Sequence, residues 1–404
     1  MKIDETIHAA TDSATRRRLF TELAEPDSNA GRRLRIAMVA PPYFDVPPRA
    51  YGGIEAVVAD LADALVANGH EVTLLGAGQP GTAAQFQPLW DRTVPELLGK
   101  PFPELAHALK ARRAIEQLAT TSGVDLVHDH TLAGPLNAVA YRELGIPLVV
   151  TAHGTVHDDL HDYYRDLRSD VKLVAISERQ RTLAPDLNWV GRVHNALRID
   201  DWPFRADKDD YALFLGRFTA DKGPDLALRA AHDADVPLVL AGKCTEPAEK
   251  SYFRETVQPL LGENDSLFGQ ADALAKRSLL GGARCLVFPV QWEEPFGMVM
   301  IEAMACGTPV VALRRGAVPE VVVDGVTGFI CDDPGDLADA IQHASLLDPR
   351  ACRRHVEANF GVERFGFGYE QIYRRALDAV PQPDGLRETS TRPRSDRQIT
   401  EMSA

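Results

Sequence analysis

Two glutamates, Glu294 and Glu302, stand eight residues apart in a stretch that is otherwise mostly apolar. Pro295 and Gly297 predict that a helix begins near residue 297, so Glu294 precedes it and Glu302 lies about one and a half turns inside. If most of the segment is helical, roughly 10–12 Å separates the carboxylates. That exceeds the about 5–9.5 Å between the paired carboxylates of a glycosidase. The spacing instead suits a carboxylate at each end of a diphosphate-linked ligand, with the N-terminus of the helix facing the phosphates.

The chemistry open to Glu302 depends on its surroundings. Met300, Ile301 and Ala303 predict an apolar, buried helix, and a buried carboxylate requires a partner. An ionised carboxylate accepts hydrogen bonds from the vicinal hydroxyls of a ribose or a hexose. The alternative for Glu302 is an exposed helix face, and the alternative for Glu294 is a charge that favours the start of a helix.

Two cations, Arg217 and Lys222, follow a predicted strand and precede a predicted helix, within the run Gly216–Gly223. Ligands of doubly wound sheets bind beyond the carboxyl ends of the strands. A diphosphate needs a bidentate donor and a point charge in such a place. The alternative is a pair of solvated surface cations.

Gly52 and Gly53 stand ahead of the first predicted helix of the body of the chain. Glycines let backbone N–H groups approach a ligand closely, and the N-terminus of a helix favours an anion such as phosphate. The pattern is neither the dinucleotide-binding fingerprint nor a Walker loop. The alternative is a plain tight turn.

Histidines end two of the predicted strands. The run His128-Asp129-His130 follows one strand and His153 follows another, which places them at the ligand-binding edge of a sheet. His153, His157 and His161 also recur at helical spacing and could hold a metal. Because Gly154 indicates that the helix starts later, and because aspartates make this face a solvated one, we expect no metal and a polar role for His153.

Length and composition limit the classes of protein to which this chain can belong. A chain of 404 residues exceeds the roughly 250–300 residues of a single core, so at least two domains are expected. With 44 basic and 58 acidic residues, the acidic body argues against nucleic-acid binding. No apolar run is long enough to cross a bilayer, and no secretory signal opens the sequence. Five cysteines without a C-x-x-C pair indicate free thiols in a cytoplasmic protein.

Short apolar runs alternate with helical patterns, which predicts an α/β fold of two tandem Rossmann-like, doubly wound domains facing an interdomain cleft. Helices are predicted at 53–67, 225–231 and 298–306. The predicted strands form two sets of six, at 35–41, 71–76, 125–129, 147–152, 173–177 and 191–196, and at 211–216, 237–242, 265–269, 285–290, 309–313 and 328–332.

The seam falls near residues 200–210, a polar stretch that contains proline. The expected division has an N-terminal domain, a C-terminal domain and a final helix that returns to the N-terminal domain, flanked by a partly disordered extension and a disordered tail. The extension spans residues 1–33 and the N-terminal domain spans 34–204. The C-terminal domain spans 205–357, the returning helix 358–380 and the tail 381–404.

A further amphipathic helix is predicted at 107–118, with Lys110, Arg112 and Arg113 on one side. It could touch an anionic membrane surface, and the alternative is an ordinary solvated face. We expect at most a peripheral membrane contact.

Taken together, these motifs resemble glycosyltransferase family 4, the retaining enzymes of GT-B fold, over most of the chain. The resemblance is strongest over 211–330, where 216–223 is similar to the family's G-R-x-x-x-x-K-G and Glu294 and Glu302 match its E-x7-E. The runs 302–310 and 318–329 are also typical of the family. The stretch 355–377 resembles the helix that returns to the N-terminal domain.

The resemblance assigns the donor site. It implies that Arg217 and Lys222 hold the diphosphate of a nucleotide-sugar donor and stabilise it as the leaving group. It also implies that Glu302 binds the nucleotide ribose and that Gly53 lines the phosphate site from the N-terminal domain.

The same resemblance places the transferred sugar. Glu294, with the backbone of Phe296, Gly297 and Met298, would contact it. His153 would lie beside the sugar or its phosphate. Together with the two cations, Glu294 and His153 are the residues for which the resemblance implies a catalytic role.

One departure from the family pattern is visible. The family often has Asn-Gly-hydrophobic-Asp after the last strand of the N-terminal domain, where this chain has Asn195-Ala196-Leu197-Arg198. Losing the glycine restricts the backbone, and the arginine reverses a charge. The departure concerns the hinge between the domains, not the donor site.

The predicted function is the transfer of a sugar, with retention, from a nucleotide-diphosphate sugar to an unidentified glycan, lipid or small-molecule acceptor. Two cations and the lack of Asp-x-Asp in the strong motifs predict no metal and no cofactor. The alternatives are a GT-B nucleotide-sugar epimerase and a non-catalytic nucleotide-sugar-binding protein. A glycan phosphorylase ranks lower, because neither Lys243 nor Lys276 stands in a pyridoxal phosphate motif.

Overall fold

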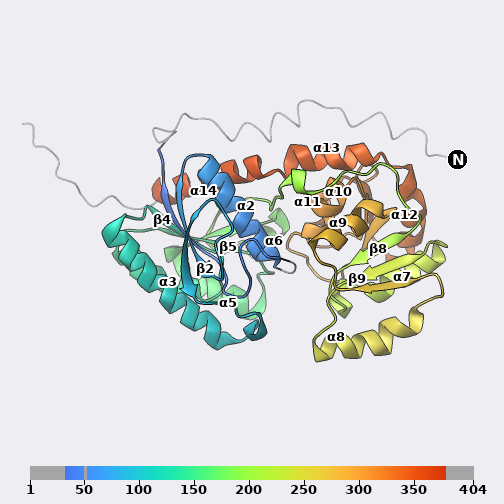
Figure 1. Ribbon diagram of the computed structural model, residues 1–404, viewed down its shortest axis with the longest axis horizontal. Coiled ribbons are helices and arrows are strands. Elements are labelled where there is room, and N and C mark those ends of the chain that lie inside the picture. Colours follow the sequence, from blue (N-terminus) through green and yellow to red (C-terminus); the bar gives the residue numbers. More distant parts are fainter. Residues whose placement is uncertain (1–31, 50–51, 379–404) are drawn as a thin grey trace, which may run out of the picture.

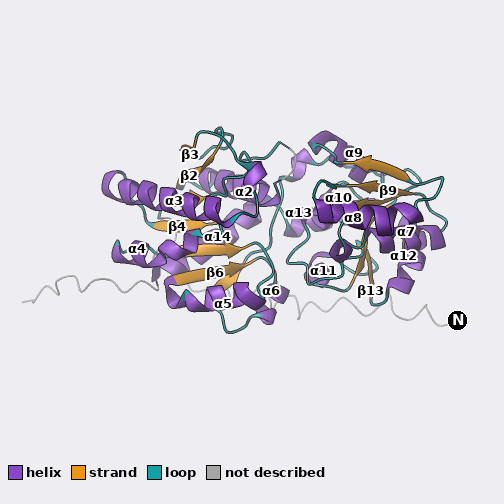
Figure 2. Ribbon diagram, turned by 90° about the horizontal axis from the view of Figure 1, so that it is seen from below, coloured by secondary structure: helices purple, strands orange, loops and turns teal. Residues whose placement is uncertain are grey.

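A computed structural model of the chain describes residues 32–49 and 52–378, which form two halves side by side. Each half is a parallel sheet between layers of helices (Figures 1 and 2). The first sheet has seven strands in the order β3-β2-β1-β4-β5-β6-β7. Its strands are β1 (Arg35–Val39), β2 (Glu71–Ala77), β3 (Gln85–Trp90), β4 (Leu126–Asp129), β5 (Leu148–Ala152), β6 (Val171–Ala175) and β7 (Trp189–Arg192).

The second sheet has six strands in the order β10-β9-β8-β11-β12-β13. In both sheets the strand order reverses beside the first strand, and ligands bind at such a switch point in open α/β sheets. The strands are β8 (Ala212–Leu215), β9 (Leu238–Ala241), β10 (Ser266–Gly269), β11 (Cys285–Phe288), β12 (Val310–Leu313) and β13 (Gly328–Cys331).

Helices connect and cover the strands. Those of the first half are α2 (Gly53–Ala67), α3 (Pro101–Thr121), α4 (Ala138–Glu143), α5 (Asp158–Asp166) and α6 (Glu178–Leu183). Those that follow β8 are α7 (Pro224–Asp233), α8 (Pro247–Tyr252), α9 (Ala273–Gly282), α10 (Met298–Ala305), α11 (Val318–Val321), α12 (Leu337–His343), α13 (Pro349–Asn359) and α14 (Val362–Asp378).

The last helix, α14, leaves the second half and packs beside α2 of the first (Figure 1). Its apolar face, which includes Phe365, Tyr369 and Tyr373, belongs to the same buried cluster as Leu61 and Leu65 of α2. Because an amphipathic helix must bury its apolar face, this packing ties the C-terminal end of the described chain to the first sheet.

The predicted α/β fold with two Rossmann-like halves is confirmed, and each of the twelve predicted strands has a counterpart. The strand predicted at 191–196 was placed too late. The chain leaves the sheet after Arg192, and Leu197 donates its backbone N–H to the carbonyl of Phe360 instead. The sequence reasoning missed β3, a half-exposed edge strand that contains Pro88, a residue that sheets accept at edge strands, at first strand positions and at bulges.

The predicted helix at 53–67 is confirmed as α2, and the basic stretch 107–118 lies within α3. Among the residues that the structure describes, no helix combines the length and the apolar character that a bilayer crossing needs. The predicted disorder concerns 1–33 and 381–404, which lie outside the described residues except for 32 and 33. The division into 34–204, 205–357 and 358–380 stays a proposal.

Candidate functional site

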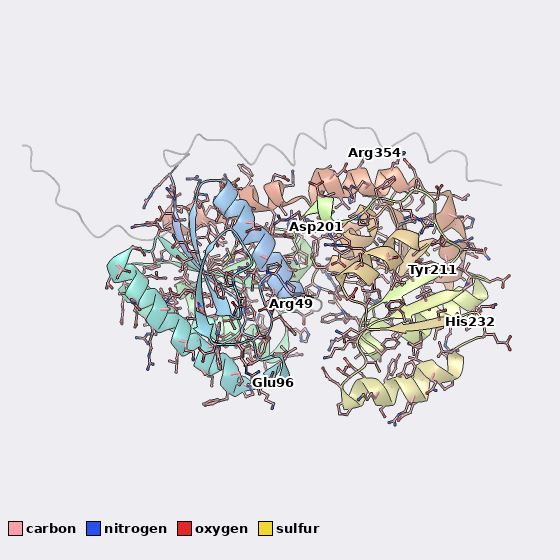
Figure 3. The ribbon with its side chains drawn as sticks, in the orientation of Figure 1. Arg49, Glu96, Asp201, Tyr211, His232 and Arg354 are labelled. Atoms are coloured by element: carbon pink, nitrogen blue, oxygen red, sulfur yellow. The ribbon has the colours of Figure 1, made fainter. Side chains whose placement is uncertain are left out.

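A pocket of about 410 Å³ lies between the two halves of the chain. The first half contributes Pro47, Pro48, Gly52 and the first turns of α2. The second half contributes loops that follow its strands and the first turns of α9 and α10, and the connection at 197–202 closes one side. Figure 3 shows Asp201 of this connection at the junction of the halves. Five predicted site residues line the pocket, namely Gly52, Gly53, Arg217, Met298 and Glu302.

Two helix N-termini meet at this pocket, because Gly53 begins α2 and Met298 begins α10. Gly297, the residue before α10, has φ 80°, a left-handed conformation that favours glycine. A Cβ on Gly297 would also lie 2.7 Å from the end of the Met300 side chain. The partial positive charges of both helices therefore act on the same space and favour an anion there.

The pocket is richer in cations than the protein as a whole. The chain has a net charge of −14, yet five basic side chains face three acidic ones among the described lining residues. The basic residues are Arg198, Arg217, Lys243, Lys276 and Arg277, and the acidic ones are Asp60, Asp201 and Glu302.

Arg217 and Glu302 keep unused hydrogen-bonding capacity in this wall. Arg217 forms no hydrogen bond or ion pair with any residue in the described ranges. Glu302 is 6% exposed, so its predicted burial is confirmed and the alternative of an exposed helix face is wrong. Its Oε1 accepts a hydrogen bond from Nζ of Lys276 at 2.6 Å, whereas its Oε2 is buried and has no partner among the described residues.

Lys276 is the partner that sequence reasoning missed. It lies on α9, and its Nζ also lies 5.5 Å from the ring centre of Trp202 in the connection between the halves. Burial of Glu302 signalled that some cation must approach it, but no local pattern pointed to a lysine 26 residues earlier.

Lys222 and Glu294 lie outside the pocket lining and pair with each other. Nζ of Lys222 lies 2.5 Å from Oε2 of Glu294, and the same oxygen accepts the indole N–H of Trp292 at 3.0 Å. Nζ of Lys222 also lies 4.6 Å from the centre of the Trp292 ring. The structure therefore pairs Lys222, which the family resemblance assigns to the diphosphate, with Glu294, which it assigns to the transferred sugar.

Phe296 turns its side chain into the core. It is 2% exposed and packs against Phe360 and His194, with ring centres 5.9 and 5.7 Å away. Only its backbone is left to approach a ligand, which is the part that the family resemblance names.

The histidines at the ends of β4 and β5 lie outside the pocket lining and form one group, in which His128 and His130 are buried and His153 is half-buried. Nδ1 of His130 lies 2.9 Å from Nε2 of His153, and His128 is bonded to Thr151 and Tyr373 at 2.8 Å each. Burial lowers the pKa of His153 to about 4 and holds the pKa values of His128 and His130 well below their usual range. These rings are therefore neutral near neutral pH.

The other two histidines of the helical spacing point elsewhere. Helix α5 begins at Asp158, so His153 lies outside it as predicted. His157 contacts Asp158 at 2.7 Å and His161 contacts Asp186 at 2.9 Å. Within the described ranges, the structure contains no group of three or more histidine, cysteine or acidic side chains able to hold a metal.

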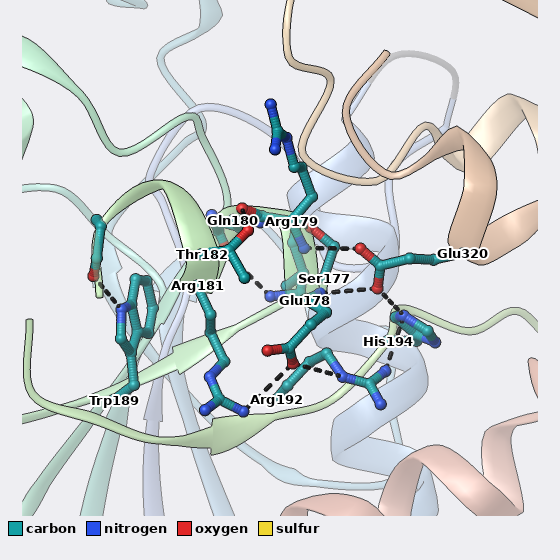
Figure 4. A network of polar contacts seen from close by, with 12 residues as sticks. Ser177, Glu178, Arg179, Gln180, Arg181, Thr182, Trp189, Arg192, His194 and Glu320 are labelled. Carbon is teal, nitrogen blue, oxygen red and sulfur yellow. Dashed lines mark hydrogen bonds and ion pairs between the residues drawn. The ribbon is translucent and has the colours of Figure 1, made fainter. Parts of the chain in front are cut away.

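A second polar network joins the halves (Figure 4). Glu320 on α11 accepts the backbone N–H groups of Glu178 and Arg179, which begin α6, at 2.7 Å each. Nε2 of His194 lies 2.9 Å from the same carboxylate. Nε of Arg179 donates to Glu293 at 2.8 Å, so the first half holds the residue that precedes Glu294.

The departure at 195–198 reaches the pocket, contrary to the expectation that it concerns the hinge alone, because Leu197 and Arg198 line it. Arg198 donates to Asp63 of α2 at 2.8 Å and lies 3.6 Å from Asp60, so aspartates of the first half balance its charge. None of residues 195–198 has a positive φ. Ala196 therefore occupies an ordinary conformation, and the connection does not need the glycine that the family pattern has there.

Comparison with known proteins gives matches along most of the chain. A family profile described as Glycosyltransferase Family 4 matches residues 51–196, and one described as Glycosyl transferases group 1 matches residues 199–359. The chain is 29% identical over 406 residues to alpha-maltose-1-phosphate synthase of Mycobacterium tuberculosis, covering 85% of this chain and 98% of the relative.

Solved structures share the architecture. AviGT4, a glycosyltransferase involved in avilamycin A biosynthesis, is 26% identical with a TM-score of 0.64 and matches 86% of this chain and 98% of its own. The sucrose-phosphate synthase of Thermosynechococcus elongatus is 21% identical with a TM-score of 0.71, over 86% of this chain and 100% of its own. At 21% identity, the likeness to the sucrose-phosphate synthase concerns the fold alone.

Proposed function

The chain belongs to glycosyltransferase family 4, whose members retain the anomeric configuration, and we propose that it moves a hexosyl group from a nucleotide-diphosphate sugar without a metal ion. The nucleoside and the diphosphate of the donor occupy the pocket between the halves. The acceptor, a glycan, a lipid or a small molecule, approaches mainly from the first half.

The proposed donor site rests on one observation: Oε2 of Glu302 is buried and has no partner in the described pocket wall. A buried carboxylate oxygen without a donor is costly. A ribose supplies hydroxyl donors of the kind that this oxygen lacks, while Lys276 keeps the other oxygen occupied. The nucleoside end of the donor therefore belongs at Glu302.

The diphosphate belongs between Glu302 and the first half. Arg217 offers a fork of N–H donors that are not used within the described chain, and α2 and α10 direct their N-termini to the same space. As the bond from sugar to diphosphate breaks, negative charge grows on the leaving phosphate. Cations and helix termini that are already in place stabilise this charge with little reorganisation.

The sugar belongs beside Glu294, with His153 approaching from the first half. Glu294 is largely buried and accepts hydrogen bonds from Lys222 and Trp292. In this arrangement Lys222 stands at the boundary between sugar and phosphate, where it serves both the orientation of Glu294 and the charge of the leaving group.

We place the protein in the cytoplasm, where free thiols persist; all five cysteines are unpaired. Any contact with a membrane is peripheral and uses α3, where Phe102, Leu105 and Leu109 are exposed beside the basic side chains.

The test is a calorimetric titration with UDP, GDP, ADP and TDP in the presence of a metal chelator, followed by the matching sugar donors with a panel of acceptors. We expect one nucleotide to bind clearly and one donor to be consumed with an acceptor. Isomerised donor without transfer would identify an epimerase instead. Binding without any turnover would leave a non-catalytic binding protein, and no binding of any nucleotide would overturn the donor site.

A further inference from the structure

His130 and His153 share one hydrogen at the edge of the first sheet. His130 follows β4 and His153 follows β5, and these strands are neighbours in the sheet. Nδ1 of His130 lies 2.9 Å from Nε2 of His153, and the two rings stack with centres 5.2 Å apart. One of the two nitrogens must donate and the other must accept.

Both rings are neutral near neutral pH, because burial lowers the pKa values of both. A neutral imidazole carries one N–H, so the position of the shared hydrogen fixes the state of both rings. If His130 donates, its own Nε2 and the Nε2 of His153 are bare. If His153 donates, the hydrogen of His130 must be on its Nε2.

The second nitrogen of His130 decides between these states. His130 is 3% exposed, and its Nε2 is buried without a partner in the described part of the chain. A buried N–H without an acceptor is rarer in proteins than a buried acceptor without a donor. The hydrogen of His130 therefore sits on Nδ1, where it is donated to Nε2 of His153.

The ring of His130 is held in this orientation by its surroundings. His128 packs against it with ring centres 4.0 Å apart. His128 in turn is fixed from both sides, by Tyr373 of α14 at Nδ1 and by Thr151 of β5 at Nε2. The helix that returns from the second half thus supports the pair at the edge of the first sheet.

We propose that His130 is a positioning residue that keeps the hydrogen of His153 on Nδ1, so that His153 presents an N–H donor to the ligand. This proposal rests on the proposed function and refines the part that His153 plays there. Nδ1 of His153 has no partner among the described residues and is not among the buried unpartnered nitrogens. It is free to donate to an oxygen of the sugar or of its phosphate, and it has no lone pair with which to act as a general base.

The position of the hydrogen can be measured directly. In full-length protein labelled with ¹⁵N in its histidine rings, long-range ¹H–¹⁵N correlation distinguishes a protonated ring nitrogen from a bare one, and the His153→Gln variant assigns the signals. At neutral pH we expect hydrogens on Nδ1 of both His130 and His153. A hydrogen on Nε2 of His153 would overturn the proposal.

The role of His130 is tested by two variants, one smaller and one larger than histidine. His130→Asn keeps an N–H donor near the place of Nδ1, whereas His130→Phe keeps the shape of the ring and removes the donor. We expect His130→Phe to lower kcat by up to roughly 100-fold, the cost of misplacing a reacting group by about 1 Å, with much less change in the KM for the donor. His130→Asn should recover most of kcat. Normal kcat in folded His130→Phe protein would refute the positioning role.

The choice between donor and base is tested at His153 itself. His153→Asn retains an N–H donor and His153→Ala retains none, so turnover that survives only in His153→Asn supports the proposal, and equal loss in both contradicts it. An absence of turnover with every nucleotide sugar would count against the proposed function. The ring spectrum needs no turnover and would still decide the proposal about His130.

Discussion

Nζ of Lys222 lies 2.5 Å from Oε2 of Glu294, although the two residues come from separate loops of the second half. The family resemblance assigns Lys222 to the diphosphate and Glu294 to the sugar. In a nucleotide sugar these two groups are joined by the bond that breaks during transfer. Under the proposed function, residues that serve its two sides should be neighbours, and we expect the bond that breaks to lie beside this ion pair.

Replacement of Lys222 by alanine is predicted to slow transfer far more than it weakens the fold. The variant removes a cation from the leaving group, and loss of one preorganised donor typically lowers kcat by roughly 100- to 1000-fold. Glu294 keeps the indole N–H of Trp292, so its carboxylate is not left without a donor. Steady-state kinetics and thermal unfolding measure the two effects.

The matched control is Lys250→Ala, which removes an exposed lysine on α8 outside the pocket. Equal kinetic effects of the two substitutions, or normal turnover in Lys222→Ala, would contradict the role in leaving-group stabilisation.

Replacement of Glu302 by alanine is predicted to weaken the binding of nucleoside diphosphates. Hydrogen bonds to a charged group contribute about 1.5–3 kcal/mol, so the dissociation constant should rise by roughly 10- to 100-fold. Pyrophosphate, which has no ribose, should bind at least as well as before, because Lys276 loses its partner and gains freedom to attract phosphate. Calorimetry with both ligands measures the difference.

Glu302→Gln is the conservative partner of that variant. Its amide keeps an oxygen acceptor in the same place, so we expect an intermediate affinity for the nucleotide. If alanine weakened pyrophosphate and nucleotide equally, the carboxylate would have no specific link to the ribose.

The elements were largely predictable from the sequence, because parallel strands buried on both faces form continuous apolar runs and helices open at glycine and proline. Burial of Glu302 was predictable for the same reason. The partners of the polar groups were not. Lys276 reaches Glu302 from a helix 26 residues earlier, and Lys222 reaches Glu294 across 72 residues.

Such pairings depend on the strand order, which brings loops together at one edge of a sheet but leaves no local pattern in the sequence. The pair of His130 and His153 illustrates the limit. Their positions after strands were predictable, whereas the contact requires that β4 and β5 are neighbours. The missed strand β3 shows the converse case, in which half-exposure and a proline hide an element that the fold uses at its edge.

Asp60 gives the pocket a predicted dependence on pH. Burial raises its pKa to about 6, although the positive charge of Arg198 opposes the shift. Because the raised pKa means that the folded state holds the proton more firmly, this group contributes stability at acidic pH that is lost as the pH rises through about 6. Below that pH the neutral Asp60 no longer repels an anion, so nucleoside diphosphates should bind more tightly than at higher pH.

The affinity for the nucleotide is measured at pH values below and above that pKa. The measurement is made for the wild type and for Asp60→Asn, and the two pH profiles are compared. The ligand's own phosphate titrates in the same range, and the comparison cancels its contribution. Glu55, whose pKa burial raises to about 7 and which lies beside Gly52 in the first turn of α2, is a second carboxyl that could titrate here, so Glu55→Gln is measured alongside. Identical profiles for wild type and Asp60→Asn would exclude Asp60 as the titrating group.

Glu320 is predicted to hold the halves together through the start of α6. Its carboxylate accepts two backbone N–H groups and faces His194. Although burial alone would raise its pKa, these hydrogen bonds keep the pKa of Glu320 below its ordinary value. Glu320→Gln retains the shape but loses the charge, and we expect the free energy of unfolding to fall by about 1–3 kcal/mol. Glu143→Gln, at an exposed position on α4, is the control.

A lowered pKa gives stability that is present above the ordinary pKa of a glutamate and is lost as the pH falls. The difference between wild type and Glu320→Gln in urea unfolding should therefore close in acid, and a difference that persists there would show that the charge is not its cause.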